Sequence, residues 1–225
     1  DLVFLRELTG GIYFGKRGRL DNGNTAYDTC TYSKEEIKRI AIKGFDLAMK
    51  RSKKLCCVDK ANVLESSRLW RETVQAMEKD YPEVSVSYEF VDAVAMRLVQ
   101  WPKSYDVLIT ENLFGDILTD EASVISGSMG LMPSASVGLK TSLYEPIHGS
   151  YPQAAGKDIA NPLATILSAA MMFEDAFKLK DEAKAIRDAV NLSLEKLIVT
   201  EDLSNGQNSF STSEVGTWLS DLILK

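Results

Sequence analysis

The sequence predicts an α/β fold in which helices pack on a parallel or mixed sheet, and three observations support it. Apolar segments typical of buried strands recur along the chain, and helical patterns lie between the later ones. This alternation is typical of βαβ units. The 225 residues, 45% hydrophobic and 26% charged, are ordinary for a globular protein of one large or two modest domains. The expected strands are Leu2–Arg6, Lys54–Val58, Val84–Phe90 and Asp106–Thr110.

Three helices are expected among these strands. Ser33 followed by two glutamates is a typical helix start, and apolar residues then recur at helical spacing. Ser67–Lys79 and Asp92–Val99 carry the other two helical patterns. Residues 13–32 are polar and rich in glycine, which indicates an excursion from the sheet. It is either a hairpin arm that docks on another subunit or a mobile loop.

A second section begins near Gly127, so we expect domains at residues 1–126 and 127–225. Leu131–Val137 leads into a loop at Glu145–Pro162 that glycine and proline residues mark. Three further helices are expected at Leu163–Phe177, Glu182–Ile198 and Ser213–Leu224.

Charge and cysteine content narrow the functional classes. The net charge of -6 argues against a general affinity for nucleic acids or anionic membranes. No apolar run is long enough to span a membrane, and we see no signal peptide before Asp1. Cys56 and Cys57 lie in an expected strand and should be buried free thiols, which fits a reducing cytoplasm. Because Asp1 is not a natural start, we expect a piece of a longer protein.

The segment Asn112–Asp120 is the most informative part of the chain. It follows the apolar run Tyr105–Ile109 and opens a helical pattern, so Asp116 and Asp120 would present neighbouring carboxylates. Their repulsion costs roughly a few tenths of a kcal/mol, and Mg²⁺ or Mn²⁺ bound between them would reverse its sign. A pair with this spacing is usually a solvated acidic face. Its place directly after a strand, where α/β sheets bind ligands, favours a metal site.

Four other residues stand where expected strands end. Lys60 could be partly desolvated there, which would lower its pKa and make it a usable base, or it could be an ordinary surface lysine. Asp92 is a plausible third carboxylate. Arg6 could bind a substrate carboxylate through its planar fork. Tyr13, just beyond a glycine pair, offers a phenol as an acid.

The loop that begins at His148 is a further candidate site. Gly149 and Gly156 allow another backbone to approach closely, and the Asn161 amide can read an adenine edge. His148 is either part of this site or an incidental surface residue. No G-x-G-x-x-G follows an expected strand, so a classical Rossmann site is not predicted.

Four separated motifs resemble those of the 3-isopropylmalate dehydrogenases, a branch of the isocitrate/isopropylmalate dehydrogenase family. They stand at residues 6–15, 58–64, 112–120 and 145–150. The form R-E-L-T-G-G-I-Y-F-G separates this branch from isocitrate, homoisocitrate and tartrate relatives. The resemblance implies that family's two-domain fold, incomplete at the amino terminus. Residues 1–126 would form the substrate, metal and dimerisation domain, and residues 127–225 would be the remaining part of the cofactor-binding domain.

The resemblance implies an oxidoreductase of leucine biosynthesis. With NAD and Mg²⁺ or Mn²⁺, 3-isopropylmalate would be oxidised and decarboxylated to 4-methyl-2-oxopentanoate, CO2 and NADH. By motif position, Arg6 would bind the malate carboxylates, Lys60 would take the hydroxyl proton, and Tyr13 would protonate the enol. A relative acting on another 3-substituted malate, or a non-catalytic subunit, is the alternative. A non-catalytic subunit is disfavoured by the joint presence of Tyr13, Lys60, Asp92, Asp116 and Asp120.

The metal and the cofactor would involve further residues. By resemblance, Asp116 and Asp120 would hold the metal, and Asp92 of a partner subunit would complete the metal and substrate site, so the enzyme would be a homodimer. The family's usual aspartate for the ribose diol is Gln153 here, which weakens the rejection of NADP. The adenosine half of NAD would lie on Glu145, His148, Gly149, Ser150, Tyr151, Pro152, Gln153, Ala154, Ala155, Gly156, Lys157, Asp158, Ile159, Ala160 and Asn161.

Overall fold

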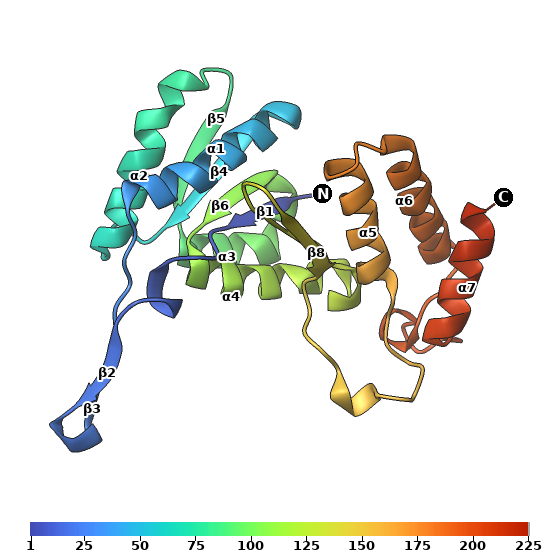
Figure 1. Cartoon of the computed structure of the whole chain (residues 1–225). Helices are drawn as coiled ribbons and strands as arrows, with labels where there is room; N and C mark the ends of the chain where they lie inside the picture. Colours follow the sequence, from blue (N-terminus) through green and yellow to red (C-terminus); the bar gives the residue numbers. More distant parts are fainter. Residues whose placement is uncertain (225) are drawn as a thin grey trace. The chain divides into compact units, whose positions relative to one another are not determined.

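The computed structural model describes residues 1–224 (Figure 1). The chain divides into two compact units, one of residues 1–122 and one that begins at Ser123. The sequence placed the division between residues 126 and 127. Within residues 1–224, no helix is long and apolar enough to cross a membrane.

The first unit is built on a four-stranded parallel sheet. Its strands follow the order β1-β6-β4-β5, and every neighbouring pair is parallel. The four expected strands are therefore confirmed, with ends that move by one residue or less from those expected. Their bounds are β1 Val3–Arg6, β4 Lys54–Asp59, β5 Ser85–Phe90 and β6 Val107–Thr110.

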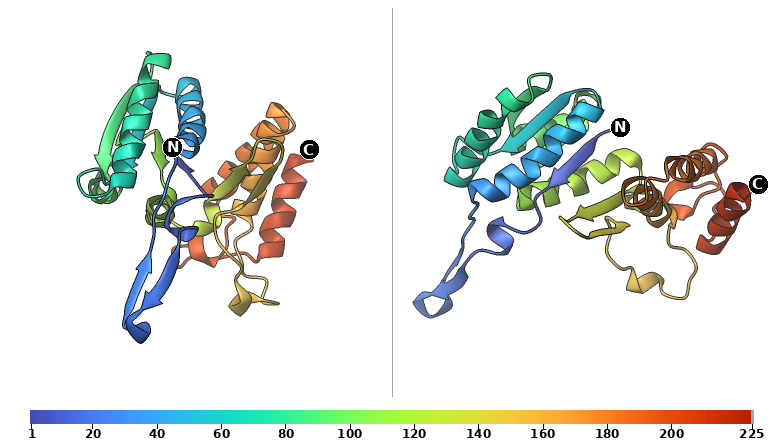
Figure 2. Two further views of the ribbon diagram at one scale, coloured as in Figure 1. Left: turned by 60° about the vertical axis from the view of Figure 1, so that its left-hand side comes forward. Right: turned by 45° about the horizontal axis from the view of Figure 1, so that its top comes forward.

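Helices cover both faces of this sheet, as Figures 1 and 2 show. The expected helix start at Ser33 is confirmed, because Ser33 and Glu36 form a reciprocal capping box. Gly44 lets this helix approach the sheet, since a Cβ there would lie 2.5 Å from Ile109 Cγ2. The helices are α1 Lys34–Lys50, α2 Glu65–Met77, α3 Val91–Gln100 and α4 Asn112–Ser123.

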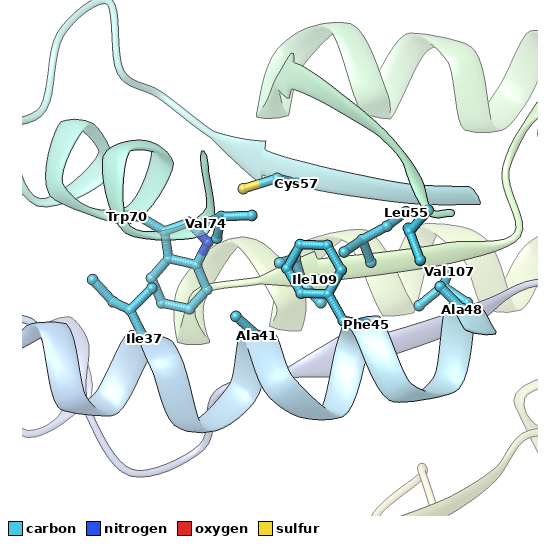
Figure 3. Close-up of a cluster of buried hydrophobic side chains, with 11 residues drawn as sticks. Ile37, Ala41, Phe45, Ala48, Leu55, Cys57, Trp70, Val74, Val107 and Ile109 are labelled. Atoms are coloured by element: carbon cyan, nitrogen blue, oxygen red, sulfur yellow. The ribbon is translucent and has the colours of Figure 1, made fainter. Parts of the chain in front are cut away.

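Alternate side chains of the central strands enter two cores. Leu55 and Ile109 pack with Phe45 of α1 and Trp70 of α2 on one face, as Figure 3 shows. The intervening residues, such as Leu108, pack with α3 and α4 on the other face. The expected buried free thiols are confirmed at Cys56 and Cys57, one on each face. Because the strands are parallel, all four end at one edge of the sheet, and the chain leaves that edge at Glu7, Lys60, Val91 and Glu111.

Residues 13–32 contain an antiparallel hairpin that stands away from the sheet (Figure 1). Its strands are β2 Arg17–Leu20 and β3 Thr25–Asp28, joined by a turn at residues 21–23. Most of its side chains are exposed.

The second unit packs three helices and a small antiparallel sheet. The helices α5 Leu163–Asp175, α6 Lys180–Glu195 and α7 Thr212–Ile223 share one apolar core. The three expected helices are confirmed, except that α6 stops three residues before the expected Ile198. Leu197 there adopts a left-handed φ of 56°, which ends the helix.

The sequence interpretation was wrong at one strand of this unit. β7 Pro133–Val137 pairs with β8 Ser142–Pro146, so Glu145 and Pro146 belong to a strand and not to the expected loop. A five-residue strand with two apolar residues is too short to show the alternation that identifies strands in a sequence.

Candidate active site

Three of the candidate residues meet where β1 and β6 end. Arg6 is the last residue of β1, and its Nη1 lies 2.7 Å from Asp116 Oδ1 on α4. The Tyr13 hydroxyl donates a hydrogen bond of 2.9 Å to Asp116 Oδ2, and this bond raises the pKa of Tyr13. The Arg6 guanidinium also lies 5.9 Å from the centre of the Tyr13 ring. A cation, a protonated phenol and a carboxylate thus form one cluster.

Lys60 and Asp92 form a second group, where β4 and β5 end. Lys60 follows β4, Asp92 lies in the first turn of α3, and their side chains make an ion pair. The Lys60 ammonium holds the pKa of the Asp92 carboxyl below its usual range. The Lys60 side chain is 26% exposed, and its Nζ lies 5.6 Å from the centre of the Phe90 ring.

A buried ion pair fixes the backbone that carries Lys60. Asp59 is 1% exposed, and its carboxylate accepts two hydrogen bonds from Arg71, of 2.7 and 3.0 Å. The same carboxylate accepts the Ala61 backbone N–H at 2.9 Å. Lys60 therefore stands between two residues that are held in place. No local pattern indicated this role for Arg71, which lies twelve positions from Asp59.

The candidate metal ligands do not form a complete site within one chain. Asp116 and Asp120 lie one turn apart on α4, whereas Asp92 is paired with Lys60 just beyond the end of β5, two strands away from β6. Among the residues that the structure describes, no three His, Cys, Asp or Glu side chains lie close enough together to hold a metal ion.

No role was expected for four polar residues near Arg6: Glu7, Glu111 and Asn112, which are buried, and Tyr32, which is partly buried. Asn112 is 2% exposed, and its Oδ1 accepts hydrogen bonds from Arg6 Nε at 3.0 Å and Nη2 at 2.8 Å. Asn112 could have been suspected from the sequence, because it is a polar residue just beyond the end of a buried strand. Tyr32 carried no such signal, because its hydrogen-bond partners lie far along the sequence.

The candidate cofactor loop of the second unit is anchored at two points. Asp158, with a φ of 56°, accepts hydrogen bonds from the backbone and hydroxyl of Ser213 at the start of α7. Asn161 donates to Asp202 at 3.0 Å and accepts the Leu163 backbone N–H at 2.9 Å. A contact from Asn161 to adenine would therefore use its second N–H and second lone pair.

The rest of that loop is more open. His148 contacts the carbonyl of Gly149 and is not buried, while Gly156 has a left-handed φ of 75°. Residues 152–154, which include Gln153, form a short 3-10 turn.

Comparison with known proteins places this geometry in a family. Residues 1–219 match the isocitrate/isopropylmalate dehydrogenase family. The 3-isopropylmalate dehydrogenases of Desulfitobacterium hafniense (strain Y51) and Bacteroides fragilis (strain YCH46) are each 56% identical to this chain, over 96% and 100% of it. The chain spans 62% and 63% of the length of these two relatives.

A solved structure gives the same result for the fold. The crystal structure of isocitrate dehydrogenase from Methylococcus capsulatus superposes with a TM-score of 0.95 and 35% sequence identity. That superposition covers 100% of this chain and 67% of the other. The chain belongs to the isocitrate/isopropylmalate dehydrogenase family.

Proposed function

We propose that the full-length protein oxidises and decarboxylates 3-isopropylmalate to 4-methyl-2-oxopentanoate and CO2, with NAD⁺ as the hydride acceptor, in leucine biosynthesis. The cluster of Arg6, Tyr13 and Asp116 carries this proposal, because it joins a carboxylate-binding cation, a proton donor and a metal-type ligand at the ends of β1 and β6. The curated relatives, at 56% identity, carry the name of this activity.

Arg6, Lys60 and Tyr13 would each have one role in the reaction, which follows from the charge or the proton that the side chain carries. Arg6 binds a carboxylate of the hydroxy-diacid, because its fork retains donors beyond those used within the chain. Lys60 of a second copy, in its neutral amine form, would take the proton of the substrate hydroxyl when NAD⁺ accepts the hydride. The Tyr13 phenol would donate its proton to the enol carbon after CO2 has left.

The donor set suits Mg²⁺ or Mn²⁺. Asp116 and Asp120 offer oxygen ligands one helical turn apart, which is the kind and number of protein ligands that these ions commonly use. Asp92 of a second copy supplies the third carboxylate. When bound, the ion acts as a Lewis acid on the substrate's oxygen atoms. Asp116 would then turn from Arg6 and Tyr13, and both would be free to face the substrate.

An exposed apolar surface supports the homodimer that this arrangement needs. The outer sides of α3 and α4 carry Met96, Val99 and Ile117, which are 62%, 72% and 55% exposed. Exposed apolar side chains gathered on neighbouring helices mark interaction surfaces. We assign this surface to a second copy of the chain.

The second unit would hold the adenosine half of NAD⁺ on Glu145 and residues 148–161. Gln153 can hydrogen-bond a ribose diol but does not repel a 2′-phosphate, so discrimination against NADP⁺ rests on the absence of a nearby cation in residues 151–155. The three free cysteines fit a reducing compartment, and we assign the protein to the cytoplasm.

Steady-state assays of the full-length protein test this function. 3-Isopropylmalate, isocitrate, homoisocitrate and tartrate would each be offered with Mg²⁺ or Mn²⁺ and with NAD⁺ or NADP⁺. We expect the highest kcat/KM for 3-isopropylmalate with NAD⁺. A higher value for another malate would establish the related activity instead, and a preference for NADP⁺ would overturn the cofactor assignment.

A further inference from the structure

The Arg6 side chain is held from behind by an almost completely buried amide. Asn112 Oδ1 accepts both Arg6 Nε and Nη2, while Arg6 Nη1 faces Asp116. A guanidinium has five N–H donors, so one donor on each of Nη1 and Nη2 remains for a ligand. The outer edge of the fork, formed by one N–H of Nη1 and one of Nη2, can bind a carboxylate bidentately when Asp116 turns away.

The orientation of this amide is fixed by chemistry. Arg6 can only donate hydrogen bonds, so the oxygen of Asn112 must face it. On its other side, Asn112 Nδ2 donates to the Gly10 carbonyl at 3.1 Å, and a carbonyl can only accept. A flipped amide would lose all three bonds. Asn112 thus ties the end of β1 to the turn that leads to Tyr13.

Tyr32 fixes Asn112 in turn. The Tyr32 hydroxyl accepts the Asn112 backbone N–H at 2.9 Å and donates to Glu111 Oε2 at 3.0 Å. Glu111 Oε1 accepts the Phe114 N–H at 2.6 Å, which secures the first turn of α4. The Tyr32 ring packs edge-on against Trp70, with 5.3 Å between the ring centres.

The turn at Gly10 and Gly11 packs directly against Tyr32. A Cβ at Gly11, whose φ is +74°, would lie 2.2 Å from Tyr32 Oη, and one at Gly10 would lie 2.8 Å from its Cε1. Glu7 closes the turn by accepting the N–H groups of Thr9 and Gly10 at 3.0 and 2.7 Å. Tyr32 therefore supports both the helix that carries Asp116 and the turn that carries Tyr13.

We infer that Asn112 and Tyr32 are positioning residues, which aim the Arg6 fork at a substrate carboxylate and hold the Tyr13 turn beside it. This inference rests on the proposed function. It predicts that changes at Asn112 act through Arg6 and impair use of the hydroxy-diacid while leaving use of NAD⁺ unchanged.

The kinetic test uses the full-length protein with Asn112→Ala, Tyr32→Phe, Arg6→Lys and the double variant Asn112→Ala/Arg6→Lys. Misplacement of a binding group by about 1 Å costs about 100-fold in rate. We therefore expect Asn112→Ala to lower kcat/KM for 3-isopropylmalate by about 100-fold and Tyr32→Phe by about 10-fold, with KM for NAD⁺ unchanged. In the Arg6→Lys background, Asn112→Ala should cost little more, because contacting residues are not additive.

Tyr105→Phe is the matched control. It removes a tyrosine–glutamate bond of 2.8 Å from a buried tyrosine in the same unit, at the start of β6 and not at its end. Its kcat/KM should match the wild type. Additive losses in the double variant, or an equal loss in Tyr105→Phe, would overturn the inference.

An independent measurement separates this inference from the proposed function. In ¹H–¹⁵N spectra the Arg6 Nε–H should be protected from exchange in the wild type, identified by its absence from Arg6→Lys. It should be lost from Asn112→Ala and kept in Tyr105→Phe. A protein that oxidises none of the malates would refute the proposed function alone, whereas a protected Arg6 signal in Asn112→Ala would refute the positioning role.

Discussion

Arg6 and Lys60 follow strands at the same edge of the sheet, and each side chain is 26% exposed, but their surroundings differ. Arg6 is bonded to Asn112, which is 2% exposed. Lys60 is paired with Asp92, whose side chain is 67% exposed. Solvent-exposed ion pairs contribute little to stability, so the Lys60–Asp92 pair can separate at little cost.

A site residue can therefore be held either through its side chain or only through its backbone. For Arg6 the side chain itself is held, which suits a residue that must present a rigid fork. For Lys60 the backbone is held by Asp59 and Arg71, and the side chain can exchange partners. A base that must accept a proton, and a carboxylate that must release a lysine to bind a metal, both need that freedom.

The largest expected effect follows from replacing Lys60. Lys60→Met should lower turnover of 3-isopropylmalate by about 10²- to 10⁴-fold, because general base catalysis contributes that much. Its stability should stay within about 1 kcal/mol of the wild type, since the lost ion pair is exposed. Steady-state kinetics and urea unfolding of the full-length protein measure the two quantities. Undiminished turnover would reject Lys60 as the base.

Removing Arg71, which holds the backbone beside Lys60 through Asp59, should lower the stability of the fold. Arg71→Ala leaves the buried Asp59 carboxylate without its cation, which costs about 3–5 kcal/mol of stability. Urea unfolding should register this loss. Lys53→Ala is the matched control, because it removes an ion pair between exposed side chains and should cost about 1 kcal/mol or less. Equal losses in the two variants would remove the distinction between buried and exposed pairs.

The rigid cluster can be disturbed through its glycine turn. Gly11→Ala imposes a left-handed φ of +74° on an alanine, which costs about 1–3 kcal/mol, and drives its Cβ against Tyr32 Oη. Gly206→Ala has nearly the same φ, +77°, with nothing within 4 Å of the new Cβ. Both variants should lose stability, but only Gly11→Ala should lose turnover. Wild-type kcat in Gly11→Ala would show that the turn can shift without affecting the site.

Much of this site could be predicted from the sequence, and the reason is topological. Once the strands were expected to be parallel, Arg6, Lys60, Asp92 and Asp116 had to gather at one edge. The sequence could not say how they are held. The bonds of Tyr32 to Glu111 and Asn112 join residues 79 and 80 positions apart, and no local pattern encodes a contact of that kind. The same limit concealed the link between Asp158 and α7.

The last expected effect concerns a buried carboxylate away from the site. Burial raises the pKa of Asp106, but hydrogen bonds from Ser52 and Arg51 outweigh it and hold that pKa below the usual value. A lowered folded-state pKa adds stability that is complete above the unfolded pKa of about 3.9 and is lost as the pH falls through the folded value. At pH 7, Asp106→Asn should therefore be less stable than the wild type by about 1.5–3 kcal/mol, the contribution of a charged hydrogen bond.

The change of this stability difference with pH gives a stricter test. The deficit of Asp106→Asn should shrink as the pH falls below about 4, because the wild type loses the same interaction there. The pKa of Asp92 is lowered as well, but its carboxylate is exposed to solvent, so Asp92→Asn should show the same pH trend with a much smaller deficit than Asp106→Asn. Urea unfolding of the three proteins between pH 3 and pH 7 measures this, in the range given by the ordinary carboxyl pKa of about 3.9. A deficit in Asp106→Asn that stayed constant across that range would mean that Asp106 stabilises the fold through packing rather than through its charge.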